Sequence, residues 1–191
     1  MGYPTQNINF VPGTSYVAVD PTGSAPSVNG LSIYEGGAGP FRQTKFVLNN
    51  MVVATTDNTT NGAQGSQKIY DFPAGAILVH GGAAKLTITG GAGLTATAAV
   101  VWAVGTVAPA ADATLTSTEA NIIPSTAATL SSSTNTASAV TATAAGILDG
   151  SSTAIDALLN FAVPDAGSSA NSTITVTGEI VITWIQLGDP V

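Results

Sequence analysis

The sequence contains no cysteine among its 191 residues. A disulfide framework, a thiol nucleophile and a zinc–thiolate site are therefore excluded, and the absence agrees with assembly in a reducing cytosol. A single histidine, His80, would leave a transition-metal site almost wholly to carboxylates. We expect neither a metal nor another cofactor.

Charged residues are also scarce. Four Lys or Arg and 11 Asp or Glu make up 8% of the chain, against about 25% in an ordinary soluble domain. A compact monomer of this size exposes roughly 8,000 Å², which leaves about one charge per 550 Å². Such a surface suits a chain that is partly covered by other proteins.

The basic residues are concentrated in the first half of the sequence. The net charge is −7, residues 1–90 sum to zero, and residues 91–191 hold seven acids and no base. This distribution offers no basic patch for neutralising phosphates, so no direct nucleic-acid partner is expected. The four basic residues are Arg42, Lys45, Lys68 and Lys85.

Long apolar segments are missing as well. The longest run, Ala98–Val104, is far shorter than the about 20 residues of a membrane span. The N-terminus has neither a basic region nor an apolar core typical of a signal peptide. Neither a membrane partner nor secretion is expected.

Residues 1–40 are rich in proline and glycine and are predicted to form an extended arm, followed by one β domain over residues 41–191. Short extended pieces are expected at Ser15–Val19 and Leu31–Tyr34. Two interpretations of the arm stay open: its apolar side chains bind a partner, or it is an edge strand folded back on its own domain.

From Thr44 onward, frequent Thr and Val predict short strands. Lys45–Thr55 alternates weakly, and a hairpin is expected between Ala76–His80 and Lys85–Thr89 across Gly81-Gly82. Residues 108–152 favour strands and long loops over helix because Ser and Thr are dense there. Leu158–Val163 is interpreted as a strand that ends at Pro164.

The C-terminal segment carries the clearest period of two. One parity is apolar and predicts a buried face, and Gly178 within it predicts a β-bulge or a sharp bend. The opposite parity turns apolar near the end, at Val181, Ile185 and Leu187. The members of the buried set are Ile174, Val176, Ile180, Ile182 and Trp184.

These patterns together predict an all-β fold, an antiparallel β-sandwich that is jelly-roll-like. A sheet closed into a barrel remains an alternative. The segments Leu86–Gly90 and Ile174–Gly178 resemble each other in sequence and are expected to be matching strand ends.

Catalytic chemistry finds little support in the sequence. His80 is interpreted as a strand-end residue rather than a catalytic base, and no enzymatic activity is expected. The acids are scattered singly, and nothing assigns a role to Asp71 or Asp112. The glycine pattern at residues 91–96 favours a glycine hairpin over a dinucleotide site, because Thr and Val follow where a helix should begin.

The two tryptophans, Trp102 and Trp184, are predicted to pack in the core on opposing sheets rather than to form a sugar-stacking platform. Aromatic residues make up only 6% of the chain, and no exposed row of them is evident.

Three segments resemble virion structural proteins of tailed bacteriophages: Lys68–Gly75, Leu159–Ala166 and Thr173–Asp189. Several such proteins resemble capsid decoration (cement) proteins, which have jelly-roll-like folds and are often trimers on the outside of the head. The resemblance implies a homotrimer that decorates and stabilises a phage capsid by bridging major capsid subunits. It implies a location on the capsid exterior after assembly in the host cytoplasm.

The charge distribution suggests how such a protein would be oriented. The arm and the four basic residues, Arg42, Lys45, Lys68 and Lys85, would face the shell, while the base-free half would point outward. The alternatives are a phage head fibre, a tail or receptor-binding module, a carbohydrate-binding β-sandwich, and a hydrolase built on a β-scaffold.

Overall fold

The computed structural model describes residues 28–95, 97–110, 114–130, 134–140 and 147–188. Within these ranges the chain forms strands and two short 3₁₀ turns, so the all-β prediction is confirmed. No helix in this part of the chain is long and apolar enough to cross a membrane. The elements are β1 (Leu31–Ala38), β2 (Phe41–Asn58), β3 (Gly62–Asp71), β4 (Gly75–Gly90), β5 (Ala99–Gly105), η1 (Ser117–Glu119), β6 (Ile123–Thr129), β7 (Thr134–Val140), β8 (Leu148–Gly150), β9 (Asp156–Val163), η2 (Asp165–Gly167) and β10 (Ser172–Gly188).

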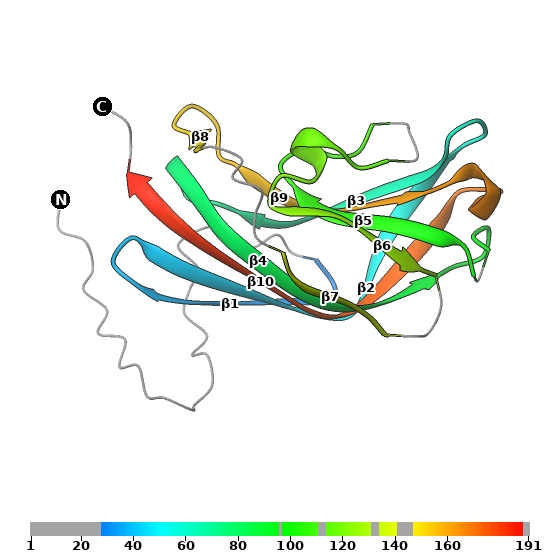
Figure 1. Ribbon diagram of the computed structural model, residues 1–191, viewed down its shortest axis with the longest axis horizontal. Coiled ribbons are helices and arrows are strands. Elements are labelled where there is room, and N and C mark those ends of the chain that lie inside the picture. The colour runs from blue at the N-terminus through cyan, green and yellow to red at the C-terminus, as the bar shows by residue number, and fades with distance from the viewer. Residues whose placement is uncertain (1–27, 96, 111–113, 131–133, 141–146, 189–191) are drawn as a thin grey trace.

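All paired strands are antiparallel and belong to one sheet, in the order β6-β5-β9-β3-β2-β10-β4-β7. β1 pairs with β2, and β8 pairs with β4. The sheet curls into a half-barrel, so that β1, β2, β10 and β4 lie opposite β3, β9, β5 and β6 (Figure 1).

The curl depends on β2, which belongs to both halves of the sheet. Its first part, Phe41–Leu48, pairs with β1, and its last part, Thr55–Asn58, pairs with β3. Between them Asn50 has a φ of 52°, a left-handed conformation that Asn tolerates. The bulge shifts the buried positions from even to odd numbers, which explains the weak alternation of the sequence here.

β10 confirms the C-terminal period of two. Its five predicted inward residues are all fully buried. The register with β2 shifts between Val176 and Gly178, where two steps along β10 face three along β2, so the bulge lies opposite Gly178, in β2 rather than in β10. The echoing segments Leu86–Gly90 and Ile174–Gly178 are antiparallel neighbours, paired with each other between β4 and β10.

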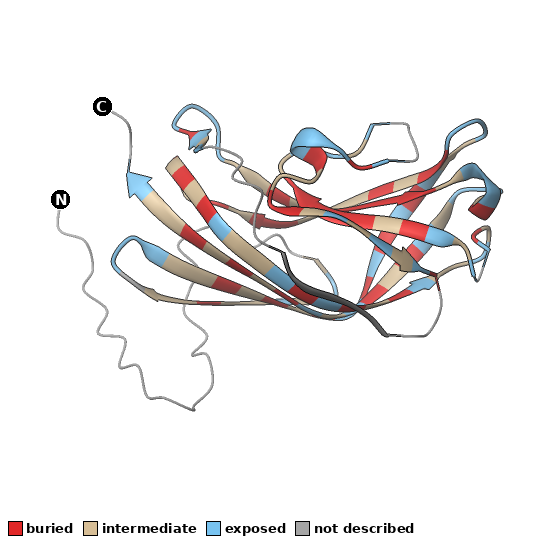
Figure 2. Ribbon diagram, in the orientation of Figure 1, coloured by how far each residue is buried: buried red, intermediate tan, exposed pale blue. Residues whose placement is uncertain are grey.

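The core lies between the two halves of the curled sheet, where buried positions alternate along the strands of both (Figure 2). Phe46, Tyr70, Phe72 and Trp184 form a cluster with ring centroids 5.2–6.4 Å apart, mostly edge to face. Such pairs each add about 1 kcal/mol beyond area burial. Trp102 on β5 is buried from the opposite half, so the predicted core role of both tryptophans is confirmed.

The predicted hairpin across Gly81-Gly82 is wrong, because β4 runs as one strand from Gly75 to Gly90. Neither glycine has the positive φ that a two-residue hairpin turn requires. A Cβ on Gly82 would lie 2.8 Å from Cγ1 of Ile123. The glycine therefore serves a close approach between strands, while His80 forms an irregularity opposite Thr183 and Trp184.

Other predicted elements have mixed outcomes. Leu158–Val163 lies within β9, so the strand interpretation is confirmed. β5 follows the glycines at 91–93 without an intervening helix in the residues described there. Residues 31–38 of the predicted arm form β1, paired with β2, whereas Ser15–Val19 and the rest of residues 1–27 lie outside the described residues.

Replacing Gly178 with Ala should destabilise the fold strongly. Gly178 has a φ of 139°, and an added Cβ would lie 2.1 Å from the carbonyl oxygen of Lys85. The backbone must shift to accommodate the added Cβ, and this shift should lower the free energy of unfolding by about 3 kcal/mol, measured by urea denaturation. Gly81→Ala is the control, because no atom lies within 4 Å of its added Cβ. Equal stability of the two variants would contradict this role of Gly178.

Candidate functional site

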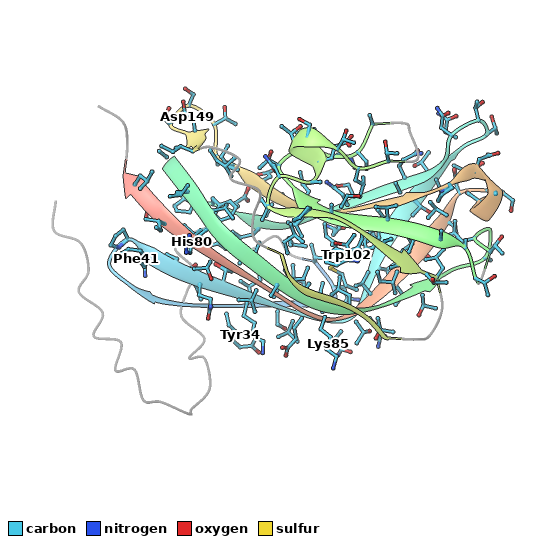
Figure 3. All side chains as sticks on the ribbon, viewed as in Figure 1. Tyr34, Phe41, His80, Lys85, Trp102 and Asp149 are labelled. Carbon is cyan, nitrogen blue, oxygen red and sulfur yellow. The ribbon has the colours of Figure 1, made fainter. Side chains whose placement is uncertain are left out.

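The structure brings two of the four basic residues together. Lys45 on β2 and Lys85 on β4 flank Glu179 of β10 on the outside of the curled sheet. Nζ of Lys45 lies 2.8 Å from Oε1 of Glu179. Lys85 pairs in register with Glu179 but forms no ion pair among the described residues, and it points away from the core (Figure 3).

Arg42 lies elsewhere, on the inward side of β2. The Tyr70 hydroxyl donates a 2.6 Å hydrogen bond to Oε2 of Glu35, and Nε of Arg42 lies 3.8 Å from Oε1 of the same carboxylate. Tyr70 is fully buried and Glu35 is 4% exposed. Nearby, Nε1 of Trp184 donates to Oγ1 of Thr44 at 2.9 Å. This network adjoins the aromatic cluster, so Arg42 serves the interior.

Lys68 lies on β3, in the other half of the sheet. Its Nζ is 2.5 Å from Asp71 and 3.0 Å from Asp156, which face each other across β3 and β9. The hydrogen bonds to both carboxylates raise the pKa of Lys68. Burial and the hydrogen bond to Asp71 raise the pKa of Asp156. Asp112, the other acid considered together with Asp71 in the sequence, lies outside the described residues.

The remaining candidate groups are dispersed. His80 is exposed on β4. No group of three or more His, Asp or Glu in the described ranges is arranged to hold a metal ion. A shallow depression of about 320 Å³ is lined by apolar and amide side chains only: Val28, Asn29, Asn50, Val52 and Gln67. The burial of both tryptophans removes them from any sugar-stacking surface.

The outside of β5 and β9 is covered by the chain itself, through a connection that the sequence did not predict. Nδ2 of the fully buried Asn160 donates to the carbonyl oxygens of Val107 and Glu119, both at 2.8 Å. Its Oδ1 accepts from Oγ of Ser66 at 2.7 Å. Leu115 packs with Ala103 and Ala162 beneath this cover. The sequence signal for this connection was Asn160, the only polar residue in the apolar run 157–163.

The outside of β2, β10 and β4 has no such cover among the described residues. Instead it carries an apolar row. Phe41 of β2 pairs with Ile185 of β10, and Ile185 pairs with Leu78 of β4. Ile147 extends the row as the residue directly before β8, which pairs Leu148 with Ile77 of β4. Phe41 and Ile147 are each 59% exposed, and Leu187 beside them is 49% exposed. We call the outer surface of β1, of β2 from Phe41 to Leu48, of β10 from Gly178 onward, of β4 up to Leu86 and of β8 the outer face, which leaves out the second half of β2. The sequence anticipated only its β10 part.

No protein-family model matches the chain, and the curated proteins contain no significant match.

Replacing Tyr70 with Phe should leave the buried Glu35 carboxylate without its 2.6 Å donor. Losing a donor to a buried polar group costs about 1–3 kcal/mol, so the free energy of unfolding should fall by that amount in urea denaturation. Tyr34→Phe, at a partly exposed position on β1, is the control. A Tyr70 variant as stable as the control would show that the hydrogen bond contributes nothing.

Replacing Asp156 with Asn should change how stability depends on pH. Because the pKa of Asp156 is raised in the folded protein, the protonated carboxyl contributes to stability below its ordinary pKa of 3.8. This contribution is lost as the pH rises through the pKa of the folded state. Relative to wild type, Asp156→Asn should therefore gain stability between pH 3 and 7, measured by urea denaturation at each pH.

Asp149 provides an opposite control. Its hydrogen bonds from the hydroxyl and backbone N–H of Ser151 lower its pKa. Its contribution is present above the ordinary pKa and lost as pH falls through the folded one. Asp149→Asn should thus lose stability relative to wild type over the same rise in pH. Shifts of the same direction in both variants would contradict these assignments.

Proposed function

We propose that this chain is a non-enzymatic structural protein of a bacteriophage virion. It decorates the outside of the capsid and stabilises it by bridging major capsid subunits. The proposal includes a homotrimeric assembly, no cofactor, and a location on the virion exterior. It extends the resemblance of three sequence segments to virion structural proteins.

The observation that carries the proposal is the outer face. It places an apolar row with two side chains 59% exposed on a sheet surface that the described residues leave uncovered. An exposed apolar patch bounded by polar residues is typical of a protein–protein contact. Together with a charge content of 8%, this favours a protein that works by assembly, where repeated weak contacts add up.

We also propose that the curled sheet is a jelly-roll-like β-sandwich and that residues 1–40 act as an arm toward neighbouring subunits. Two facing halves that share one core, with a tryptophan from each, support the sandwich. For the arm, β1 already belongs to the sheet, so any reach to neighbours falls to residues 1–27.

The shell contact is assigned to the basic residues, of which Lys85 is the most accessible. Lys45 and Lys68 already bind carboxylates of their own chain. A shell contact would therefore rely on Lys85, and on Lys45 once it exchanges Glu179 for a carboxylate of the shell. Arg42 lies against the buried Glu35, so it contributes to the stability of the docking half.

The test is addition of the purified protein to undecorated phage heads, with bound copies counted after sedimentation. Wild-type protein should bind saturably. Reversing Lys45, Lys68 and Lys85 to Glu should lower occupancy roughly tenfold or more, since multivalent contacts are lost together. Asp165→Asn, at an exposed turn, is the control, and circular dichroism verifies folding. Absence of saturable binding by wild type would overturn the decoration function.

A further inference from the structure

The outer face has a pattern that is complementary to itself. Across β2, β10 and β4 the apolar row reads Phe41, Ile185 and Leu78, and Ile147, the residue directly before β8, extends it. The two outer members are each 59% exposed, and the two inner members are half-buried. A line drawn between β10 and β4 therefore divides the row into two apolar halves of similar exposure.

One pair of opposite charges on the same face stands across the same line. Three rows of side chains further along the sheet, Glu179 of β10 stands directly opposite Lys85 of β4. One side of the line thus carries a carboxylate at the height where the other side carries an ammonium group. Rotating the face by 180° about this line exchanges the two positions, so that each charge meets its opposite.

We propose that the outer face binds the outer face of a second copy of this chain, about a twofold axis that runs between β10 and β4 parallel to the strands. This relation places Leu78 over Ile185 of the second copy and Phe41 over its Ile147. It also places Lys85 over its Glu179. The proposal rests on the part of the proposed function in which copies associate, and does not depend on capsid binding.

The size of the face suits this partner. β2 contributes eight residues, Phe41–Leu48, or about 27 Å of strand, and four strands about 4.8 Å apart add about 19 Å of width. The resulting flat footprint of about 500 Å² corresponds to a larger accessible area once side chains are included. It approaches the roughly 800 Å² per partner found in stable pairs.

The charge of the whole chain favours a copy over an unrelated partner that binds by charge. Each copy carries a net charge of −7, so two copies repel wherever unpaired acids meet. The outer face is the exception, since its two bases, Lys45 and Lys85, balance two acids, Glu179 and the exposed Asp149 of β8. Lys85 serves both this contact and the shell contact proposed above, so the two contacts are alternatives for the outer face.

The mass in solution tests the inference first. Light scattering of the full chain from 1 to 200 µM should give an even number of chains, two alone or six if trimers also form. Phe41→Ser with Ile147→Ser should weaken association at least tenfold. Val52→Ser, also on β2 and 52% exposed, should leave it unchanged. A mass of one or three chains at every concentration would overturn the proposal, and so would equal weakening by Val52→Ser.

A charge exchange tests the orientation of the two copies. Lys85→Glu should weaken association because two carboxylates then meet across the axis. Adding Glu179→Lys should restore most of it, because the exchanged positions are again opposite in charge. Failure of the double variant to recover would contradict the proposed axis, provided that its circular dichroism and monomer stability match those of Lys85→Glu.

The absence of cysteine allows a direct proximity test. A short bis-maleimide should link two copies of Thr183→Cys, which lies on the outer face of β10, but not two copies of Ala166→Cys in the exposed η2 turn. Equal linking of both would overturn the contact. An even-numbered assembly that fails to bind phage heads would leave this inference standing and reject the decoration function.

Discussion

The structure depends on the pairing of β10 with both β2 and β4. This central strand is hydrogen-bonded along nearly its whole length on each side. Its inward residues, from Ile174 to Trp184, are fully buried and form the floor of the core. Because side chains alternate along a strand, the same backbone that fixes the core also fixes the outer face. The buried core and the outer face therefore share one register.

The two outer surfaces of the curled sheet differ in whether the described part of the chain covers them. The outside of β5 and β9 is closed by a connection held through the buried Asn160. The outside of β2, β10 and β4 keeps an apolar row open among the described residues. Since exposed apolar surface is costly for an isolated protein, this asymmetry is understandable if a partner covers the second face. The proposals on function and on copy association both start from this contrast.

Much of the fold was predictable from local periodicity. The β10 alternation and the burial of Trp184 followed from residue spacing, and Gly178 marked the place where β2 bulges opposite it. The β4 hairpin failed because glycine signals both turns and close approach, and the contact of Gly82 with Ile123 is set by tertiary packing. The alternation of β2 looked weak in the sequence because the bulge at Asn50 moves the buried positions from even to odd numbers halfway along the strand.

The candidate site was less predictable than the fold. Charge spacing along the chain grouped Arg42, Lys45, Lys68 and Lys85, but strand parity and register separate them. Arg42 faces inward, and Lys68 lies on the opposite half. The apolar row brings together residues from 41 to 185, which only the strand order β2-β10-β4 and the β8 pairing make neighbours. No spacing within the sequence encodes that adjacency.

Hydroxyl-radical footprinting over a range of protein concentrations would test the central claim, that the chain assembles through the outer face, most directly. The method reports the solvent accessibility of individual side chains, and the molecule supplies its own controls. Phe41 and Ile147 on the face, and Val52 and Val107 away from it, are all about half exposed in the single chain. Assembly through the outer face should protect only Phe41 and Ile147 as the concentration rises. Equal labelling of all four at every concentration would contradict it.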